Sequence, residues 1–157
     1  MANKKLAIIA SKGTLEWAYQ PLILASTAAA LGYEARIFFT FYGLEILKKN
    51  LNLQVSSLGN PAMPLPGNMP MPVILQAMPG MQALITGMMK RKMHANGVVD
   101  LEELRKLCVE AEVKMIACQM SMDLFGIKRR DLLDRCECGG AATFFEFAGA
   151  SDMSLFV

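Results

Sequence analysis

The chain has 157 residues with a formal net charge of +2, and 54% of its residues are hydrophobic while 19% are charged. This length fits one domain over residues 1–157, and the apolar content excludes extended disorder because burial can offset the entropy lost on folding. The basic residues are scattered apart from two short clusters, which excludes a continuous phosphate-binding surface, so we expect no nucleic-acid partner.

The N-terminus and the low charge content indicate the setting of the protein. Residues 1–5 lack the apolar segment and the cleavage site of a secretory signal, so we expect a cytoplasmic protein. In that compartment the four cysteines should be mostly reduced thiols, free for metal binding, redox chemistry or packing. The positive mean hydropathy predicts apolar surface that another copy of the chain covers, so we also expect a homo-oligomer.

The first forty residues have the pattern of a strand, a helix and a second strand. An apolar run over residues 5–10 predicts a strand, and Thr14 can cap a helix over residues 15–31 that Gly32 ends. A second apolar run over residues 35–41 predicts the next strand. This βαβ order implies parallel strands and a right-handed crossover. A short helix over residues 44–49 and a weak third strand over residues 53–58 follow.

Residues 60–93, called the Met/Pro-rich flap below, differ sharply in composition from the rest. They hold six of the seven prolines and eight of the thirteen methionines, so we read them as an insertion. Residues 80–93 could form an apolar helix that ends in three basic residues. The apolar stretch over residues 73–89 is short and interrupted by Pro79 and Gly80, so it should not span a membrane. We expect the flap to contact another subunit, a partner or a membrane, because methionine side chains adapt to irregular surfaces.

Regular elements return at Asp100, which can cap a helix that runs to about residue 112. The spacing predicts one buried face, made of Leu101, Leu104, Leu107, Cys108 and Ala111. Residues 114–120 predict a strand, and Ser121 can cap a helix over residues 122–126. A helix near residues 130–134, a helix that opens at Gly139 and Gly140 and reaches about residue 150, and a strand over residues 152–157 complete the α/β pattern.

The carboxyl ends of parallel strands meet at one edge of a sheet, where ligands bind in folds of this class. The predicted pocket residues are Ser11, Lys12, Gly13, Tyr42, Gly43, Gln119, Met120 and Ser121. The nucleophile at this edge is Cys118. A thiol just before a helix that starts at Ser121 should favour the thiolate, which could hold or attack sulfur. A buried cysteine that only packs is the alternative.

The remaining candidate sites have plainer explanations. Cys108 lies on an apolar helical face, as a core cysteine would, although it could approach Cys118 if its helix lies beside that strand end. Cys136 and Cys138 are too few for a closed zinc site, and the chain has a single histidine, His94, so we expect neither a metal nor a cofactor. Residues 11–14 could bind an anion but lack a complete phosphate-binding motif.

Several segments resemble the DsrE/DsrF-like family, in its sulfur-carrier branch that is often labelled peroxiredoxin-like. The most specific match covers residues 113–127 around Cys118, and residues 37–44, 60–64 and 139–143 support it. The resemblance implies a single open five-stranded parallel sheet flanked by helices, in a Rossmann- or flavodoxin-like three-layer arrangement. It also implies a trimer, tetramer or hexamer. Cys118 matches the strand-end family cysteine and Cys108 a second one, whereas Cys136 and Cys138 have no usual counterpart.

The resemblance implies a sulfur carrier or sulfurtransferase component. Cys118 would receive sulfane sulfur as a persulfide or thiosulfonate from a donor or pass it to an acceptor, such as a rhodanese or a sulfur-carrier protein, and Cys108 could assist. Two alternatives stay open. The chain could be a non-catalytic oligomeric module that docks a membrane or a sulfur-metabolism partner through the Met/Pro-rich flap. It could also be a thiol redox sensor that forms a Cys108–Cys118 disulfide.

Overall fold

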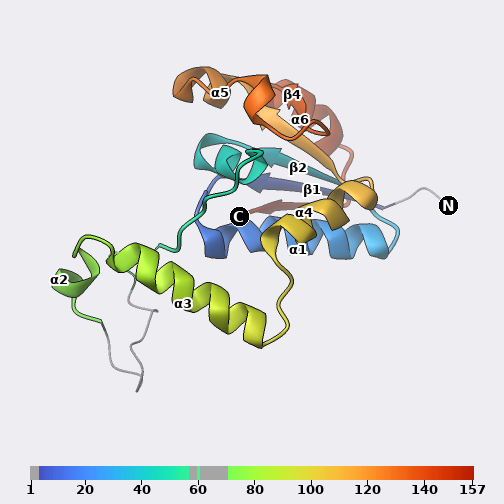
Figure 1. The fold of residues 1–157 in the computed structure, drawn as a ribbon. Helices are drawn as coiled ribbons and strands as arrows, with labels where there is room; N and C mark the ends of the chain where they lie inside the picture. The colour runs from blue at the N-terminus through green and yellow to red at the C-terminus, as the bar shows by residue number, and fades with distance from the viewer. Residues whose placement is uncertain (1–3, 57–59, 61–70) are drawn as a thin grey trace.

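The computed structural model describes residues 4–56, 60 and 71–157, which form a sheet of five parallel strands flanked by helices (Figure 1). The strand order across the sheet is β4-β3-β2-β1-β5. The strands are β1 (Lys5–Ala10), β2 (Glu34–Phe39), β3 (Lys114–Cys118), β4 (Glu137–Gly139) and β5 (Met153–Phe156). The predicted α/β class with a five-stranded parallel sheet is therefore confirmed.

The connections between strands decide which helices cover which face. Helix α1 (Leu15–Ala30) joins β1 to β2, and α4 (Leu101–Glu110) precedes β3, so both crossovers step in the same direction along the sheet. Right-handed crossovers in one direction place their helices on one face. Helix α6 (Ala141–Ala148) leads from β4 back across the sheet to β5, which places it on the other face (Figure 1).

Each face of the sheet has its own apolar core, because successive side chains of a strand point to opposite faces. The larger core packs against α1 and α4 and contains Met115 and Ala117 from β3. The smaller core packs against α6 and contains Ile116 and Cys118 from the same strand. The two cysteines that the sequence singles out fall on different faces, since Cys108 belongs to the larger core.

One predicted strand is wrong, and one strand of the sheet was not predicted. The described part of the weak third strand, residues 53–56, is not a strand, and residues 57 and 58 lie outside the described residues. There the Val55 N–H donates to the hydroxyl of Thr86 at 3.1 Å, so a side chain takes the place of a neighbouring strand. The strand that was not predicted is β4, a three-residue edge strand whose Cys138 pairs with Ala117.

The shorter elements also differ from their predictions. The segment after β2 is the 3₁₀ helix η1 (Phe41–Leu47), and the predicted helix near residue 130 is the 3₁₀ turn η2 (Arg129–Asp131). In α4 the predicted buried face is wrong at two positions, because Leu107 and Ala111 are exposed. Arg105 is buried instead, and its Nη1 donates to the carbonyls of Ile46 and Lys48 at the end of η1.

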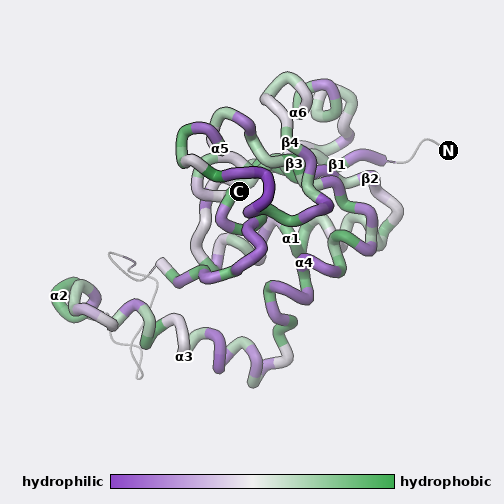
Figure 2. Tube along the Cα trace, turned by 45° about the horizontal axis from the view of Figure 1, so that its top comes forward, coloured by the Kyte–Doolittle hydropathy of each residue, from purple (hydrophilic) through white to green (hydrophobic). Residues whose placement is uncertain are grey.

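The described part of the Met/Pro-rich flap contains α2 (Val73–Gln76) and α3 (Met81–Ala95), which project from the sheet and its covering helices (Figure 2). The predicted helix over residues 80–93 is thus present. Residues 61–70, the proline-rich start of the flap, lie outside the described residues. Among the described residues, no helix is both long enough and apolar enough to cross a membrane.

Candidate functional site

Cys118 stands at the point where β3 becomes helix α5 (Gln119–Phe125). It is the last residue of the strand and the N-cap of the helix, so the predicted cap at Ser121 is wrong by three residues. Only 5% of its surface is exposed. The side chain points to the face covered by α6, where it borders an apolar core on one side and the first turn of α5 on the other.

Two hydroxyl groups lie beside the Cys118 sulfur. Ser121, fully buried in the first turn of α5, provides one, and Thr40 provides the other. Their oxygens are 3.1 Å apart. Thr40 lies beside Cys118 because Phe39 is the register partner of Ala117. Thr40 follows Phe39 and Cys118 follows Ala117, so the two residues lie side by side at the carboxyl ends of neighbouring strands.

The hydrogen bond from Phe41 fixes the role of the Ser121 hydroxyl. The Phe41 N–H donates to Ser121 Oγ at 3.0 Å, which leaves the Ser121 proton to donate toward Cys118 or Thr40. Phe41 adopts a left-handed backbone with φ of 47° to do so. This conformation is uncommon for an aromatic residue and costs of order 1–3 kcal/mol, so the surrounding packing must hold it in place.

The environment of Cys118 favours its ionised form. Burial alone would raise the pKa of this thiol. The side chain and the N–H of Ser121, the Thr40 hydroxyl and the Met120 N–H all donate to the sulfur, and together they lower the pKa below its ordinary value. Hydrogen bonds to the charged form of a group stabilise that form, so the site can hold a thiolate with little exposure to water.

Cys108 has the opposite chemistry on the opposite face of the sheet. It is fully buried between α4 and α1, and its Sγ donates to the Leu22 carbonyl at 3.3 Å. Burial raises its pKa to about 11, in spite of hydrogen bonds from Ser26 that favour the thiolate. The structure does not bring Cys108 to Cys118, because the sheet lies between the two side chains.

The other two cysteines lie on β4 and just before it. Cys136 is buried in the larger core and its pKa is raised, chiefly by burial. Its carbonyl accepts a 2.7 Å hydrogen bond from Arg129, which also bonds the carbonyls of Leu133 and Asp134. Cys138 is exposed. Among the described residues no three His, Cys, Asp or Glu side chains gather as metal ligands would.

The predicted pocket residues of the first two loops meet each other. A Cβ at Gly13 would lie 2.2 Å from the Tyr42 carbonyl oxygen, and one at Gly43 would lie 2.2 Å from the Ala10 carbonyl oxygen. The Gly43 N–H also donates to the Ser11 carbonyl. Only glycine fits at both positions, and the backbone itself fills the space that a ligand would need there.

The predicted anion site at the start of α1 is also occupied by protein. The Leu15 N–H donates to the Gln54 carbonyl at 2.9 Å, and the Glu16 carboxylate accepts the Ser56 N–H at 3.0 Å. Lys12 is drawn aside, with its Nζ 3.1 Å from the centre of the Trp17 ring. Residues 11–14 therefore act as a strand-to-helix turn.

Three predicted pocket residues lie on η1 and in the first turn of α5, the two elements that follow β2 and β3 and contact each other. Met120 and Tyr42 are exposed, and the Tyr42 ring packs on Phe125 at 5.4 Å between ring centres, which joins η1 to α5. Gln119 bonds Asp123 within α5 at 2.9 Å.

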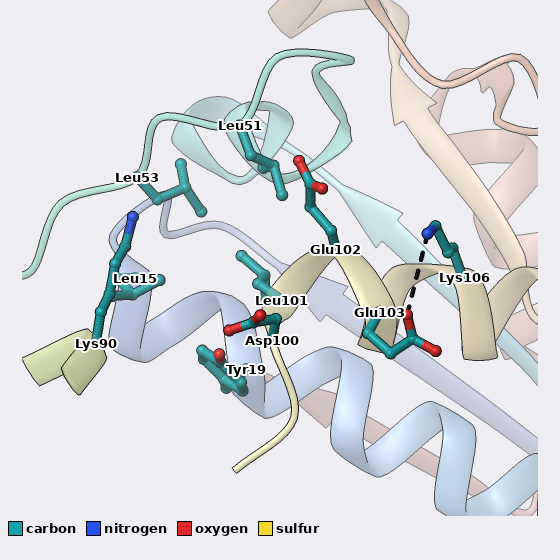
Figure 3. Close-up of a pocket in the computed structure, with 10 residues that line it drawn as sticks. All are labelled: Leu15, Tyr19, Leu51, Leu53, Lys90, Asp100, Leu101, Glu102, Glu103 and Lys106. Carbon is teal, nitrogen blue, oxygen red and sulfur yellow. Dashed lines mark ion pairs between the residues drawn. The ribbon is translucent and has the colours of Figure 1, made fainter. Parts of the chain in front are cut away.

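A cavity of about 300 Å³ lies elsewhere, between α1, the chain at Leu51 and Leu53, and the start of α4 (Figure 3). Its rim carries Asp100, Glu102 and Glu103, of which Glu103 pairs weakly with Lys106 at 4.0 Å. The residues that line it include neither Cys118 nor any predicted pocket residue. It is separate from the thiol site.

Thr40 is a side chain of the candidate site that sequence reasoning missed. It follows a predicted strand, and the rule that collects residues at the carboxyl ends of strands could have included it. The prediction extended that strand to residue 41, which placed Thr40 inside the strand instead of at its end. The strand in fact stops at Phe39.

Known proteins resemble this chain over its whole length. A relative from Allochromatium vinosum, named sulfur carrier protein DsrE2, is 61% identical and covers all of both chains. A Bacillus subtilis protein, the uncharacterized protein YrkE, is 30% identical over 99% of this chain and 98% of its own. The crystal structure of the ychN protein from E. coli, at 14% identity, superposes with a TM-score of 0.60 over 98% of this chain and 99% of that one. A family model, described as the DsrE/DsrF/DrsH-like family, matches residues 2–156, and the chain belongs to that family.

Proposed function

We propose that the protein is a sulfur carrier that holds sulfane sulfur on Cys118. The observation that carries the proposal is the thiol at the start of α5, where donors from Ser121, Thr40 and Met120 converge on one sulfur atom. A relative 61% identical over the full length is named a sulfur carrier protein, which supports the same activity here.

The transfer step needs only a thiolate and a donor persulfide. The Cys118 thiolate attacks the outer sulfur of the donor, a new S–S bond forms at Cys118, and the S–S bond of the donor breaks. The donor leaves as a thiolate, the outer sulfur keeps its proton as it is transferred to Cys118, and no external oxidant is consumed. The hydroxyls of Ser121 and Thr40 then solvate the terminal sulfur. A thiol of moderately lowered pKa is suited to this exchange, because a very acidic thiol is a poor nucleophile.

The exposure of the site indicates how the sulfur would be delivered. Only 5% of Cys118 is exposed, so a donor must bring its sulfur to a thiol that has little contact with water. A donor that presents its sulfur on a projecting cysteine, such as a rhodanese or another sulfur-carrier protein, fits this approach. Small polysulfides and tetrathionate fit as well, and tetrathionate would leave a thiosulfonate on Cys118 and release thiosulfate.

Mass spectrometry of the intact protein tests the proposal. The background is Cys138→Ser, because an exposed thiol reacts with polysulfide by itself. After incubation with polysulfide, this background and its Cys108→Ser derivative should gain sulfur that cyanide removes as thiocyanate. The Cys118→Ser derivative should gain none. Equal gain by the Cys118→Ser and Cys108→Ser derivatives would disprove the assignment.

The positions of Cys108 and Cys118 favour the carrier over a redox sensor. A disulfide requires Cα atoms within about 7 Å and converging Cβ atoms. Cys108 and Cys118 belong to separate cores on the two faces of the sheet. We therefore propose that Cys108 serves packing and that the sulfur is held by Cys118 alone.

We also propose that the protein assembles with itself. Phe145 on α6 and Phe156 on the edge strand β5 are both mostly exposed, and Met153 on β5 is about half exposed. Large aromatic side chains in this state are typical of an interface between subunits. Light scattering during gel filtration checks the assembly, and Phe145→Ser with Phe156→Ser should lower the measured mass if this face joins the subunits.

A further inference from the structure

The outer surface of the flap helices α2 and α3 is unusually apolar. Large side chains stand in solvent along both helices and the turn between them, and Ile74 is 83% exposed. The exposed apolar residues are Val73, Ile74, Leu75, Met78, Leu84 and Met88. This set is continuous along the chain from α2 into α3.

The opposite side of α3 is attached to the rest of the protein. Ile85 and Thr86 are buried, the Thr86 hydroxyl accepts the Val55 N–H, and the side-chain amide of Gln82 donates to the Val55 carbonyl at 3.1 Å. Leu84, Met88 and Arg91 follow one another at spacings of four and three residues. They therefore share the side of the helix that turns away from the buried residues.

The charge of the same segment has one sign. No Asp or Glu occurs between Glu45 and Asp100, whereas Lys90, Arg91 and Lys92 form a basic cluster near the end of α3. All three side chains are exposed, and none forms an ion pair with any residue that the structure describes. Lys90 borders the cavity of Figure 3, where the ion pair drawn is Glu103 with Lys106.

We propose that α2 and α3 bind the surface of an anionic lipid bilayer. The exposed apolar side chains would enter the boundary between headgroups and acyl chains, and the basic cluster would contact the negative headgroups. Apolar side chains beside unpaired Lys and Arg are the features of segments that lie on a membrane without crossing it. Figure 2 shows that these helices project from the sheet body, so the surface can be reached from outside.

A second copy of the chain is a poorer match for this surface. In a two-fold interface the same surface meets itself, and each subunit must supply what the other requires. The flap helices supply cations and no carboxylate, so their basic clusters would stay unneutralised on association. An anionic bilayer provides both the negative charge and the apolar phase.

Vesicle sedimentation with the full chain tests the proposal. The protein should bind vesicles of phosphatidylcholine with phosphatidylglycerol, should bind pure phosphatidylcholine weakly, and should lose binding as salt is raised. Each basic residue near such a surface contributes roughly fivefold to partitioning, so the triple variant Lys90→Gln, Arg91→Gln, Lys92→Gln should bind about a hundredfold less. The pair Ile74→Ser and Leu84→Ser should also weaken binding, with an unchanged circular dichroism spectrum.

A matched charge control separates local contact from net charge. Lys106, Lys114 and Arg130 are exposed, and their ion pairs are 3.9–4.0 Å long, so their change to Gln removes the same charge with little structural loss. This control should bind nearly as wild type. The proposal is overturned if the control loses as much binding as the flap variant, or if anionic vesicles bind no protein. It is also overturned if Ile74→Ser with Leu84→Ser splits an oligomer while vesicle binding persists.

Discussion

Cys118 and Cys108 are both buried, on opposite faces of one sheet, yet their thiols differ in acidity. Cys118 is 5% exposed and Cys108 is 0% exposed. At Cys118, the effect of burial is outweighed by donors from Ser121 and Thr40, which point at the sulfur and lower its pKa. At Cys108, burial outweighs the donors present and raises the pKa to about 11. Whether a buried thiol is acidic therefore depends on the balance between the effect of burial, which raises its pKa, and the hydrogen bonds to the sulfur, which lower it.

The two sulfur atoms should differ most in their rates of alkylation. The pKa of Cys108 is about 11 and that of Cys118 lies below the ordinary 9.0, so the thiolate fractions at pH 8 differ by at least about a hundredfold. Iodoacetamide should modify Cys118 in the folded Cys138→Ser protein and leave Cys108 intact. Peptide mapping over time gives both rates, and labelling in denaturant confirms that both peptides are detected. Equal alkylation rates of Cys118 and Cys108 in the folded protein would show that the two thiols do not differ in acidity as proposed.

The raised pKa of Cys108 predicts a loss of stability at high pH. The folded protein keeps this proton up to about pH 11, whereas the unfolded chain releases it near 9.0, so the stabilisation is complete below pH 9 and is lost as pH rises toward 11. Wild type should lose about 2 kcal/mol more than Cys108→Ala over this interval. Urea titrations at several pH values measure the difference, in which the other titrating groups cancel. Parallel pH profiles for the two proteins would show that the thiol titrates alike in both states.

The hydroxyl groups beside Cys118 should have a smaller, measurable effect. Ser121→Ala removes a donor to the thiolate, which should lower the thiolate fraction at neutral pH about tenfold. Because nucleophilicity rises with pKa, the alkylation rate should fall only about threefold. The pH profile of the rate should move to higher pH.

Thr40→Val should shift the profile in the same direction and less, because Ser121 makes the larger contribution to the lowered pKa. Ser151→Ala is the matched control, because it removes a partly buried hydroxyl that donates to the Phe147 carbonyl of α6 and not to Cys118. This control should leave the profile in place. An unchanged pH profile in both Ser121→Ala and Thr40→Val would show that these hydroxyls do not lower the pKa of Cys118.

The sequence predicted only part of the difference between Cys118 and Cys108. The apolar runs of β1, β2 and β3 and the strand-end position of Cys118 could be read from residue order, because buried parallel strands are continuous apolar stretches. The sequence did not show that Cys108 and Cys118 lie on opposite faces of the sheet, because this depends on which face α4 covers. That follows from the strand order, which is a tertiary property.

The errors at the sheet edge have a related cause. Residues 53–56 alternate as a strand would, with Leu53 and Val55 buried, but their backbone partners come from α3 and the start of α1 and not from a neighbouring strand. β4 has three residues and leaves Glu137 and Cys138 exposed, so it has no apolar pattern to detect. Strand pairing between distant segments decided both cases, and local propensity carried little information.

The smallest effect should come from the thiol at this edge. Cys138 is exposed on β4 and its backbone pairs with Ala117, so Cys138→Ser keeps the ladder and exchanges one small exposed group for another. The free energy of unfolding should change by no more than about 0.5 kcal/mol. Urea titration at pH 7 measures it, and the alkylation rate of Cys118 should be unchanged, which is what makes this variant a suitable background. A loss well above that figure would mean that Cys138 is covered in the assembled protein, and that the edge of the sheet beside Cys118 forms part of a subunit contact.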